Sequence, residues 1–304
     1  MKKPIFIDYN IGFDNIIFIL SAIFIRGISL DTININISRD VKLIDINNIV
    51  NLTKLSDKNI KLIFEKNSPI INSNKDEDRV NEEVLDFIRK IDYQIEDSPK
   101  IMLRKLKESH KKASIISTGN LSNIAKMFLS CPEIKKNINK IVVVGGAIYG
   151  GNCTPCAEKN IFSDAYAADI VFNSGVPIIM CGLDVTEKTH LSNEEINELL
   201  ECIRSSTNKY ITDYIKNELI CFFESLKISD KSLANLCGVI YASNPDIFKF
   251  DKCSVSVETG GEFTYGCTVV DINHVLQETR NVDVVYSLDI KKFVFILKNF
   301  LSNM

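Results

Sequence analysis

Short apolar runs alternate with longer amphipathic stretches along most of the chain. The apolar run 4–7 ends at Asp8 and a polar turn, and a helical pattern then covers 14–25. Alternation at every second position predicts a strand over 31–37, and a helical period predicts a helix over 41–55. Strands and helices in this repeated order are typical of a parallel sheet with helices on both faces.

The same pattern continues as far as residue 180, with a polar stretch over 65–81. Apolar runs predict strands over 60–64, at 115–116, over 141–144 and over 177–180. Helical periods predict helices over 82–91 and 99–112, from Asn120 to about Leu129, and over 165–172. The loops that follow these strands should meet at the carboxyl edge of the sheet, where open α/β sheets bind ligands.

The pattern changes after Leu191. A capped helix start at 192–195 opens a mainly helical stretch to 226, and a further helix is predicted over 232–242. Strands return over 254–258, 267–271 and 282–286, before a terminal helix over 290–301. Neither a repeat nor a linker marks a boundary. The sequence therefore predicts one α/β domain over residues 1–304, a mostly parallel open sheet flanked by helices, with a helical subregion after residue 190.

Composition narrows the classes of partner. A formal net charge of −3 with 25% charged residues gives no electrostatic footprint for nucleic acid. The longest apolar run, 16–25, is half the roughly 20 residues that a membrane-spanning helix needs. Nine cysteines at irregular spacing suit reduced thiols, and the N-terminus lacks the pattern of a signal peptide. We expect a cytoplasmic protein with neither a nucleic-acid nor a membrane partner.

Candidate chemistry begins at the turn after the first strand, which reads DYNIGFDN over 8–15. A polar turn with two acids is common at protein surfaces, so this segment alone is a weak signal. Four further segments accompany it, namely STGNLSNIA at 117–125, VGGA at 144–147 with GNCTPCAEKN at 151–160, CGLDVT at 181–186 and GCTVVD at 266–271.

Together and in this order, these segments resemble the inosine–uridine-preferring nucleoside hydrolase family. The family motifs read DxDPGxDD, TGxLTNIA, GGxxxxGNxTxxAEFN, GLDVT and GxTVxD. The resemblance runs from residue 7 to 271 and is weakest over 60–112. It implies the α/β fold described above and hydrolysis of the N-glycosidic bond of a small-molecule ribonucleoside. Because family members are usually dimers or tetramers, it also implies a homodimer or homotetramer.

The resemblance further implies a calcium ion that binds the ribose and the attacking water. Calcium takes 6–8 oxygen ligands, with carboxylates supplying charge, and a neighbouring aspartate acts as base. The metal positions are occupied here by Asp8, Asn10, Asn15, Thr118 and Asn235. The family has aspartates where this chain has its three asparagines, and Asn10 stands at the base. We therefore expect calcium to bind weakly or not at all.

The sugar-binding positions agree better with the family. Asp14, Asn152, Glu158 and Asn160 match the residues that hold the ribose hydroxyls, and Asn235 belongs to this set as well as to the metal set. On the base side, the family's histidine that assists the departing base is replaced by Ala234.

Two main hypotheses follow from these matches. In the first, the chain hydrolyses ribonucleosides with a degenerate calcium site, and Asn10, Asp14 and Glu158 occupy the catalytic positions. In the second, it is a catalytically inactive protein that binds a nucleoside or ribose. A purely structural role, such as a partner for an active paralogue, is a third.

Three further features have open interpretations. Cys153 and Cys156 form a CxxC without a second ligand pair, so we favour small residues in a packed loop over a zinc or redox site. His190 could reach a bound base, although a surface loop histidine is the interpretation we favour. Arg39 could pair with an acid or an anionic ligand, or face solvent.

Overall fold

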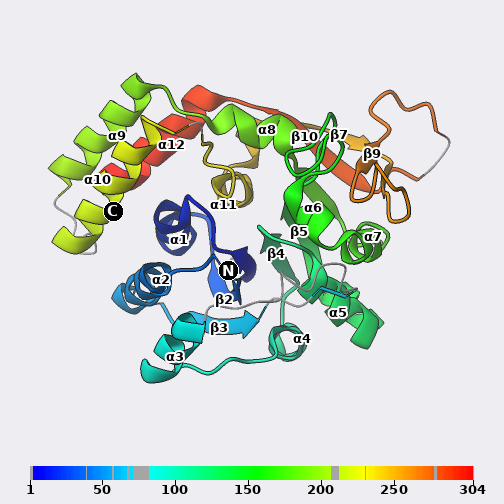
Figure 1. Cartoon of the computed structure of the whole chain (residues 1–304), viewed down its shortest axis with the longest axis horizontal. Helices are drawn as coiled ribbons and strands as arrows, with labels where there is room; N and C mark the ends of the chain where they lie inside the picture. The colour runs from blue at the N-terminus through cyan, green and yellow to red at the C-terminus, as the bar shows by residue number, and fades with distance from the viewer. Residues whose placement is uncertain are drawn as a thin grey trace.

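The computed structural model describes residues 3–38, 40–56, 58–66, 69–70, 82–206, 212–229, 231–276 and 279–303. An eight-stranded sheet crosses the molecule in the order β3-β2-β1-β4-β5-β6-β10-β7, with helices on both faces (Figure 1). Every neighbouring pair in this sheet is parallel except β10 and β7, which are antiparallel at one edge. The predicted fold class, a mostly parallel α/β sheet, is confirmed.

The strands of the main sheet are β1 (Ile5–Asn10), β2 (Leu30–Ile37), β3 (Lys61–Lys66), β4 (Ala113–Ser117), β5 (Ile138–Val144), β6 (Ile178–Cys181), β7 (Phe248–Cys253) and β10 (Val282–Leu288). The strands predicted over 254–258 and 267–271 are β8 (Val255–Val257) and β9 (Thr268–Val270), which pair with each other outside this sheet. The sequence pattern does not predict β7, because this edge strand has charged, exposed positions that hide the apolar alternation.

Helices separate into two layers. The layer on one face holds α1 (Asn15–Phe24), α2 (Leu43–Leu55), α3 (Glu82–Lys90) and α11 (Leu236–Ser243), and the layer on the other holds α4 (Ser98–Glu108), α5 (Ser122–Ser130) and α7 (Ala165–Phe172). The short α6 (Lys159–Ser163) and α8 (Leu183–Thr186) follow β5 and β6. Helix α4 begins one residue before its predicted range 99–112 and ends at Glu108, ahead of β4 at Ala113.

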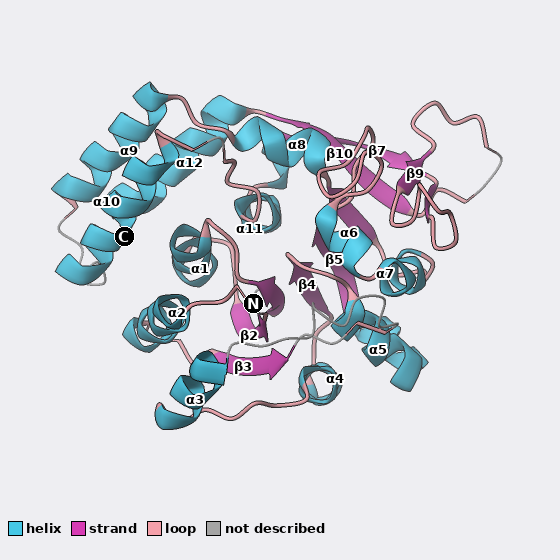
Figure 2. Cartoon of the chain, in the orientation of Figure 1, coloured by secondary structure: helices cyan, strands magenta, loops and turns pink. Residues whose placement is uncertain are grey.

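The predicted helical subregion after residue 190 is present. It consists of α9 (Asn193–Ser205) and α10 (Asp213–Leu226), and α9 packs against both α10 and the terminal helix α12 (Ile290–Asn303). Figure 2 shows these three helices together at one end of the molecule. Across the described residues, we find no helix with the length and apolar character that a membrane crossing needs.

Strand β1 separates two apolar cores. Ile7 and Tyr9 face the layer of α1 and α2, where the Tyr9 ring stacks on Phe18 with 4.5 Å between ring centres. Phe6 faces the layer of α4 and α5. Because side chains alternate along a strand, Asp8 and Asn10 share the face of Phe6. The chain runs outward through β1, β2 and β3 and then returns to the other side of β1 with β4, so the sheet has a topological switch point between β1 and β4.

A layer of amides surrounds Asp8 beneath this switch point. Its Oδ1 accepts hydrogen bonds from the Nδ2 atoms of Asn34 (2.6 Å), Asn36 (3.0 Å) and Asn123 (3.1 Å). Burial raises the pKa of Asp8, and the three amide donors act against that rise by stabilising the charged form. Asp8 therefore has its negative charge compensated by amide dipoles on β2 and α5.

Glu65 is a second buried acid at this layer. It is paired with Asn36 in the β2–β3 register and is 9% exposed. Burial, followed by the charge of Asp8, raises its pKa to about 8. The folded chain therefore holds the Glu65 proton at pH values where an unfolded chain has lost it.

The substitution Glu65→Gln should increase stability in alkaline solution. The contribution of Glu65 to the stability of the native chain is fully present below the unfolded pKa near 4.5, and it is lost as the pH rises through about 8. A glutamine does not titrate, so the variant should gain about 1–3 kcal/mol over the native chain between pH 5 and pH 9. Urea unfolding at both pH values measures this gain, with the exposed Glu108→Gln as the matched control. If both variants gained the same stability between pH 5 and pH 9, the result would contradict the raised pKa of Glu65.

Candidate active site

A cavity of about 330 Å³ lies at the carboxyl edge of the sheet, beside the switch point. It is lined by Phe13, Asp14, Val144, Gly145, Asn152, Glu158, Asn160, Gly182, Leu183, Thr186, Glu187, His190, Lys231, Ser232, Ala234 and Asn235. All of the predicted sugar-side residues are in this set. Four residues at the predicted metal positions do not line the cavity: Asp8, Asn10, Asn15 and Thr118. Asn10 is the last residue of β1, and Thr118 follows the neighbouring strand β4.

Glu158 is fixed by the backbone on one of its oxygens. It is the N-cap of α6, and its Oε2 accepts from the backbone N–H of Gly146 (3.0 Å), Asn160 (2.9 Å) and Ile161 (3.2 Å). Gly146 makes this turn at φ 77°, a conformation that favours glycine. Burial raises the pKa of Glu158, and the three N–H donors oppose that rise. Because these bonds all use Oε2, Oε1 is the oxygen left for a ligand hydroxyl.

Asn160 and Asn152 are also held by backbone groups. The Asn160 Nδ2 donates to the carbonyls of Val144 (2.9 Å) and Thr118 (3.4 Å), and the Asn152 Oδ1 accepts from the N–H of Lys159 (2.9 Å). A carbonyl only accepts and an N–H only donates, so both amide orientations are determined. Asn160 is left with an acceptor, Oδ1, and Asn152 with a donor, Nδ2. A sugar diol, which both donates and accepts, complements these groups.

Asp14 is joined to Asn235 by two hydrogen bonds. Its Oδ1 accepts from the Asn235 Nδ2 at 2.7 Å, and its Oδ2 accepts from the Asn235 backbone N–H at 3.0 Å. The carboxyl is 3% exposed. Burial raises the pKa of Asp14 to about 6, against the lowering effect of the Asn235 donors. The bonds connect the turn before α1 to the residue that precedes α11, so this contact closes one wall of the cavity.

The remaining asparagines at metal positions have other partners. The Asn15 Oδ1 accepts from the Tyr9 hydroxyl at 3.1 Å, and its Nδ2 donates to Asp45 at 3.3 Å. Asn10 lies against Gly119, where an added Cβ would come within 2.4 Å of its Cγ. The Asn10 Oδ1 is a buried oxygen without a hydrogen-bond partner among the described residues. Asn15 is thus hydrogen-bonded to Asp45 of α2, and Asn10 is half-buried against Gly119.

The metal positions of the family carry mostly uncharged oxygens in this chain. Calcium requires several oxygens that converge and are partly carboxylate. Here the Asn235 NH₂ group donates to Asp14 and the Asn15 oxygen accepts from Tyr9. The Asn10 Oδ1 and the Asp8 Oδ2 are buried oxygens without a hydrogen-bond partner among the described residues. Across the described ranges, no three His, Cys, Asp or Glu side chains are grouped so that they could hold a metal ion.

The features that the sequence left open are placed as follows. His190 is exposed, as expected for a loop histidine, and it also lines the cavity. All nine cysteines are free thiols, and neither Cys153 nor Cys156 lines the cavity. Arg39 lies outside the described residues. Phe13 and Lys231 line the cavity although sequence analysis did not single them out, because only the chain fold brings 231–235 to the turn at 12–14.

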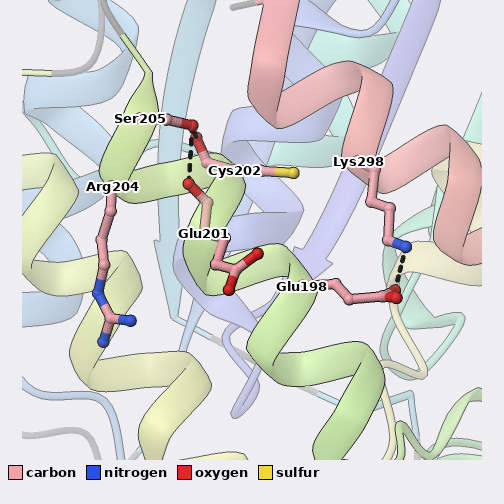
Figure 3. Close-up of a pocket in the computed structure, with 6 residues that line it drawn as sticks. All are labelled: Glu198, Glu201, Cys202, Arg204, Ser205 and Lys298. Carbon is pink, nitrogen blue, oxygen red and sulfur yellow. Dashed lines mark hydrogen bonds and ion pairs between the residues drawn. The ribbon is translucent and has the colours of Figure 1, made fainter.

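A second hollow, of about 810 Å³, lies on α9 and α12 and contains no residue of the candidate site. Two contacts join residues that line it: Lys298 contacts Glu198, and the Ser205 Oγ donates to the Glu201 carbonyl at 2.8 Å (Figure 3). This hollow is separate from the strand ends where the predicted residues gather.

The chain belongs to the nucleoside hydrolase family. The family model described as "inosine-uridine preferring nucleoside hydrolase" matches residues 5–294, which confirms the resemblance based on the motifs. Non-specific ribonucleoside hydrolases RihC from Escherichia fergusonii and Escherichia coli are each 32% identical to this chain over 304 residues, with 96% of both sequences covered.

Solved structures support the same fold. A purine-preferring ribonucleoside hydrolase from Gardnerella vaginalis aligns with a TM-score of 0.79 at 23% identity, covering 99% of this chain and 98% of that one. An inosine-uridine preferring nucleoside hydrolase from Bacillus anthracis aligns with a TM-score of 0.80 at 17% identity, covering 99% and 100%. At these identities, the likeness concerns the fold alone.

The substitution Asn235→Ala should destabilise the chain by about 1–3 kcal/mol, because it removes a donor from a buried carboxylate. The matched control is Asn173→Ala, which removes a similar bond of 2.7 Å from Asn173 to the side chain of Asp169 at the surface. We expect that control to cost less than about 0.5 kcal/mol. Denaturant unfolding measures both, and equal losses would show that the Asp14–Asn235 contact does not support the site.

Proposed function

We propose that the chain is a ribonucleoside N-ribohydrolase, in which water cleaves the base from a ribonucleoside bound in the 330 Å³ cavity. The observation that carries the proposal is the convergence of Asp14, Asn152, Glu158 and Asn160 on this cavity, each with its orientation set by hydrogen bonds. Groups fixed in this way lose little entropy when they bind a sugar. The activity that the relatives' names state, hydrolysis of ribonucleosides, fits this pocket.

In the proposed reaction the sugar lies among these four side chains. The Glu158 Oε1 and the Asn160 Oδ1 accept from ribose hydroxyls, and the Asn152 Nδ2 donates to one. Asp14 is the carboxylate that takes the proton of the attacking water, since Asn10 has no basic oxygen of that strength. Water then bonds to C1′ while the bond between C1′ and the base breaks.

We further propose that calcium binds weakly or not at all. The family generally depends on calcium, but the three asparagines at its carboxylate positions remove three formal charges from the site. Two of these asparagines form hydrogen bonds with nearby side chains: Asn235 donates to Asp14, and Asn15 accepts from Tyr9. Ionised aspartates at the same positions would repel one another without a cation.

A second candidate function is a nucleoside- or ribose-binding protein without turnover. The specific observation in its favour is Asn10, an uncharged amide at the position of the family's base. We also propose, from the family resemblance, that the chain forms a homodimer or homotetramer. The irregularly spaced cysteines support the proposal that it acts in the cytoplasm.

Hydrolysis of a ribonucleoside panel separates the two candidates. We expect release of base, at a rate that changes less than about twofold between excess chelator and millimolar calcium. In Asp14→Asn the rate should fall at least about 100-fold, because the proton acceptor is lost. A chromatographic assay for free base and free ribose measures all of these rates. Binding without base release would favour the second candidate, and turnover that requires calcium would contradict the metal proposal.

The triple substitution Asn10→Asp, Asn15→Asp and Asn235→Asp should create calcium dependence. Without calcium, the added carboxylates repel Asp14 and Asp45, so the melting temperature should fall. With millimolar calcium, a ligand that binds only the folded chain should raise it again. Thermal unfolding with and without calcium measures the shift, and the native chain is the control. The absence of a calcium-dependent shift in the variant would show that these positions do not surround one site.

A further inference from the structure

A lysine lines the cavity of the proposed site among several acids. The acids are Asp14, Glu158 and Glu187. Lys231 is the one lysine or arginine among the described residues that line the cavity. When an N-glycosidic bond breaks, its electron pair moves onto the departing base, which thereby gains negative charge. Carboxylates oppose that charge and an ammonium group favours it, so Lys231 has the sign of charge that the reaction needs.

Phe13 offers a base a surface to pack on. The side chains of Asn152, Glu158 and Asn160 present hydrogen-bonding groups to the cavity, whereas Phe13 presents a phenyl ring. Aromatic rings of this kind stack on the faces of purines and pyrimidines. Phe13 is 38% exposed, and it contacts the buried Phe222 of α10 with 5.4 Å between ring centres. The ring is therefore anchored by α10 and partly open to a ligand.

Lys231 lies against this ring. Its Nζ is 4.1 Å from the centre of the Phe13 ring, which is within the range of a cation–π contact. The segments of the two residues are also joined close by, through the hydrogen bonds of 2.7 and 3.0 Å from Asn235 to Asp14. The ammonium group is thus positioned before a ligand binds, as electrostatic stabilisation of a transition state requires. A base that packs beside Phe13 has Lys231 as its charged neighbour.

We infer that Lys231 stabilises the negative charge of the departing base through its ammonium group. The inference rests on the proposed hydrolase function and adds a catalytic residue to it. As the C1′–N bond breaks, the bonding pair goes to the base nitrogen, and the base leaves as an anion beside Lys231. Water forms the C1′–O bond and gives one proton to Asp14, which later passes it to solvent. The base takes a proton from solvent, so ribonucleoside and water become ribose and neutral base, and Lys231 keeps its protons throughout.

The test compares ribonucleosides whose bases leave with different charges. Guanosine and cytidine release anionic bases. At about pH 6, 7-methylguanosine and 3-methylcytidine carry a positive charge on the base and release it as a neutral molecule. In Lys231→Met, we expect kcat on guanosine and cytidine to fall about 10- to 100-fold, because the charge that faces the departing base is lost. On the two methylated ribonucleosides, kcat should stay within about threefold of native, and KM should fall because a cationic base is no longer repelled.

Two further variants serve as controls. Lys231→Arg keeps the charge and the contact with an aromatic face, so it should retain kcat on guanosine and cytidine within about fivefold of native. Lys135→Met removes another lysine from a phenyl ring, since the Lys135 Nζ lies 5.3 Å from the centre of the Phe128 ring, outside the cavity. This variant should leave all four rates unchanged.

Each other outcome has a definite meaning. Native rates on guanosine and cytidine in Lys231→Met would overturn the inference while leaving the hydrolase function in place. Equal losses on the neutral and the methylated ribonucleosides, or a loss in Lys231→Arg as large as in Lys231→Met, would assign Lys231 a structural role and overturn it too. If His190→Gln gave the selective loss and Lys231→Met did not, the role would belong to His190. A native chain that cleaves none of these ribonucleosides would refute the proposed function itself, and the inference with it.

Discussion

The contact between Asp14 and Asn235 holds the candidate site together. Asp14 precedes α1 and Asn235 precedes α11, and 221 positions separate them in the sequence. A buried carboxylate is costly unless donors surround it, and Asn235 provides two from one residue, its side-chain amide and its backbone N–H. An aspartate at position 235, which the family resemblance implies, would place a second carboxylate beside Asp14, and the two would repel each other. In this chain the Asn235 amide donates to Asp14 instead, and this contact closes one wall of the cavity.

Hydrogen bonds from amide groups also surround other polar side chains near the switch point of the sheet. Asp8 is compensated by amides from β2 and α5, and Asn15 is held between Tyr9 and Asp45. At the cavity, backbone N–H and carbonyl groups orient the side chains of Glu158, Asn152 and Asn160. The side chains around the cavity are thus oriented by hydrogen bonds to amide and backbone groups, which supports the proposal that the site keeps its shape without a tightly bound ion.

Much of this arrangement was predictable from the sequence, because the strand ends carry the motif residues and parallel strands bring their carboxyl ends together. The fold class and the gathering of the motif residues at one edge followed from that rule, and the family followed from the resemblance of the motifs. The amide layer around Asp8 did not. Asn34 and Asn36 alternate with isoleucines in β2, and alternating polar residues in a strand usually indicate a solvent-facing side. They are buried because α5 covers that face. The positions of His190 and Lys231 depend on how separate loops pack, and no local pattern encodes that.

The most direct test of a hydrogen-bonded site is a crystal structure of the native chain grown with millimolar calcium and a ribonucleoside analogue that cannot be cleaved. We expect sugar hydroxyls bonded to Asp14, Asn152, Glu158 and Asn160, with the Asn235 amide still donating to Asp14. We expect no cation among Asn10, Asn15, Thr118 and Asn235. A calcium ion coordinated by those residues, with Asn235 turned away from Asp14, would contradict the proposal of a site held by hydrogen bonds.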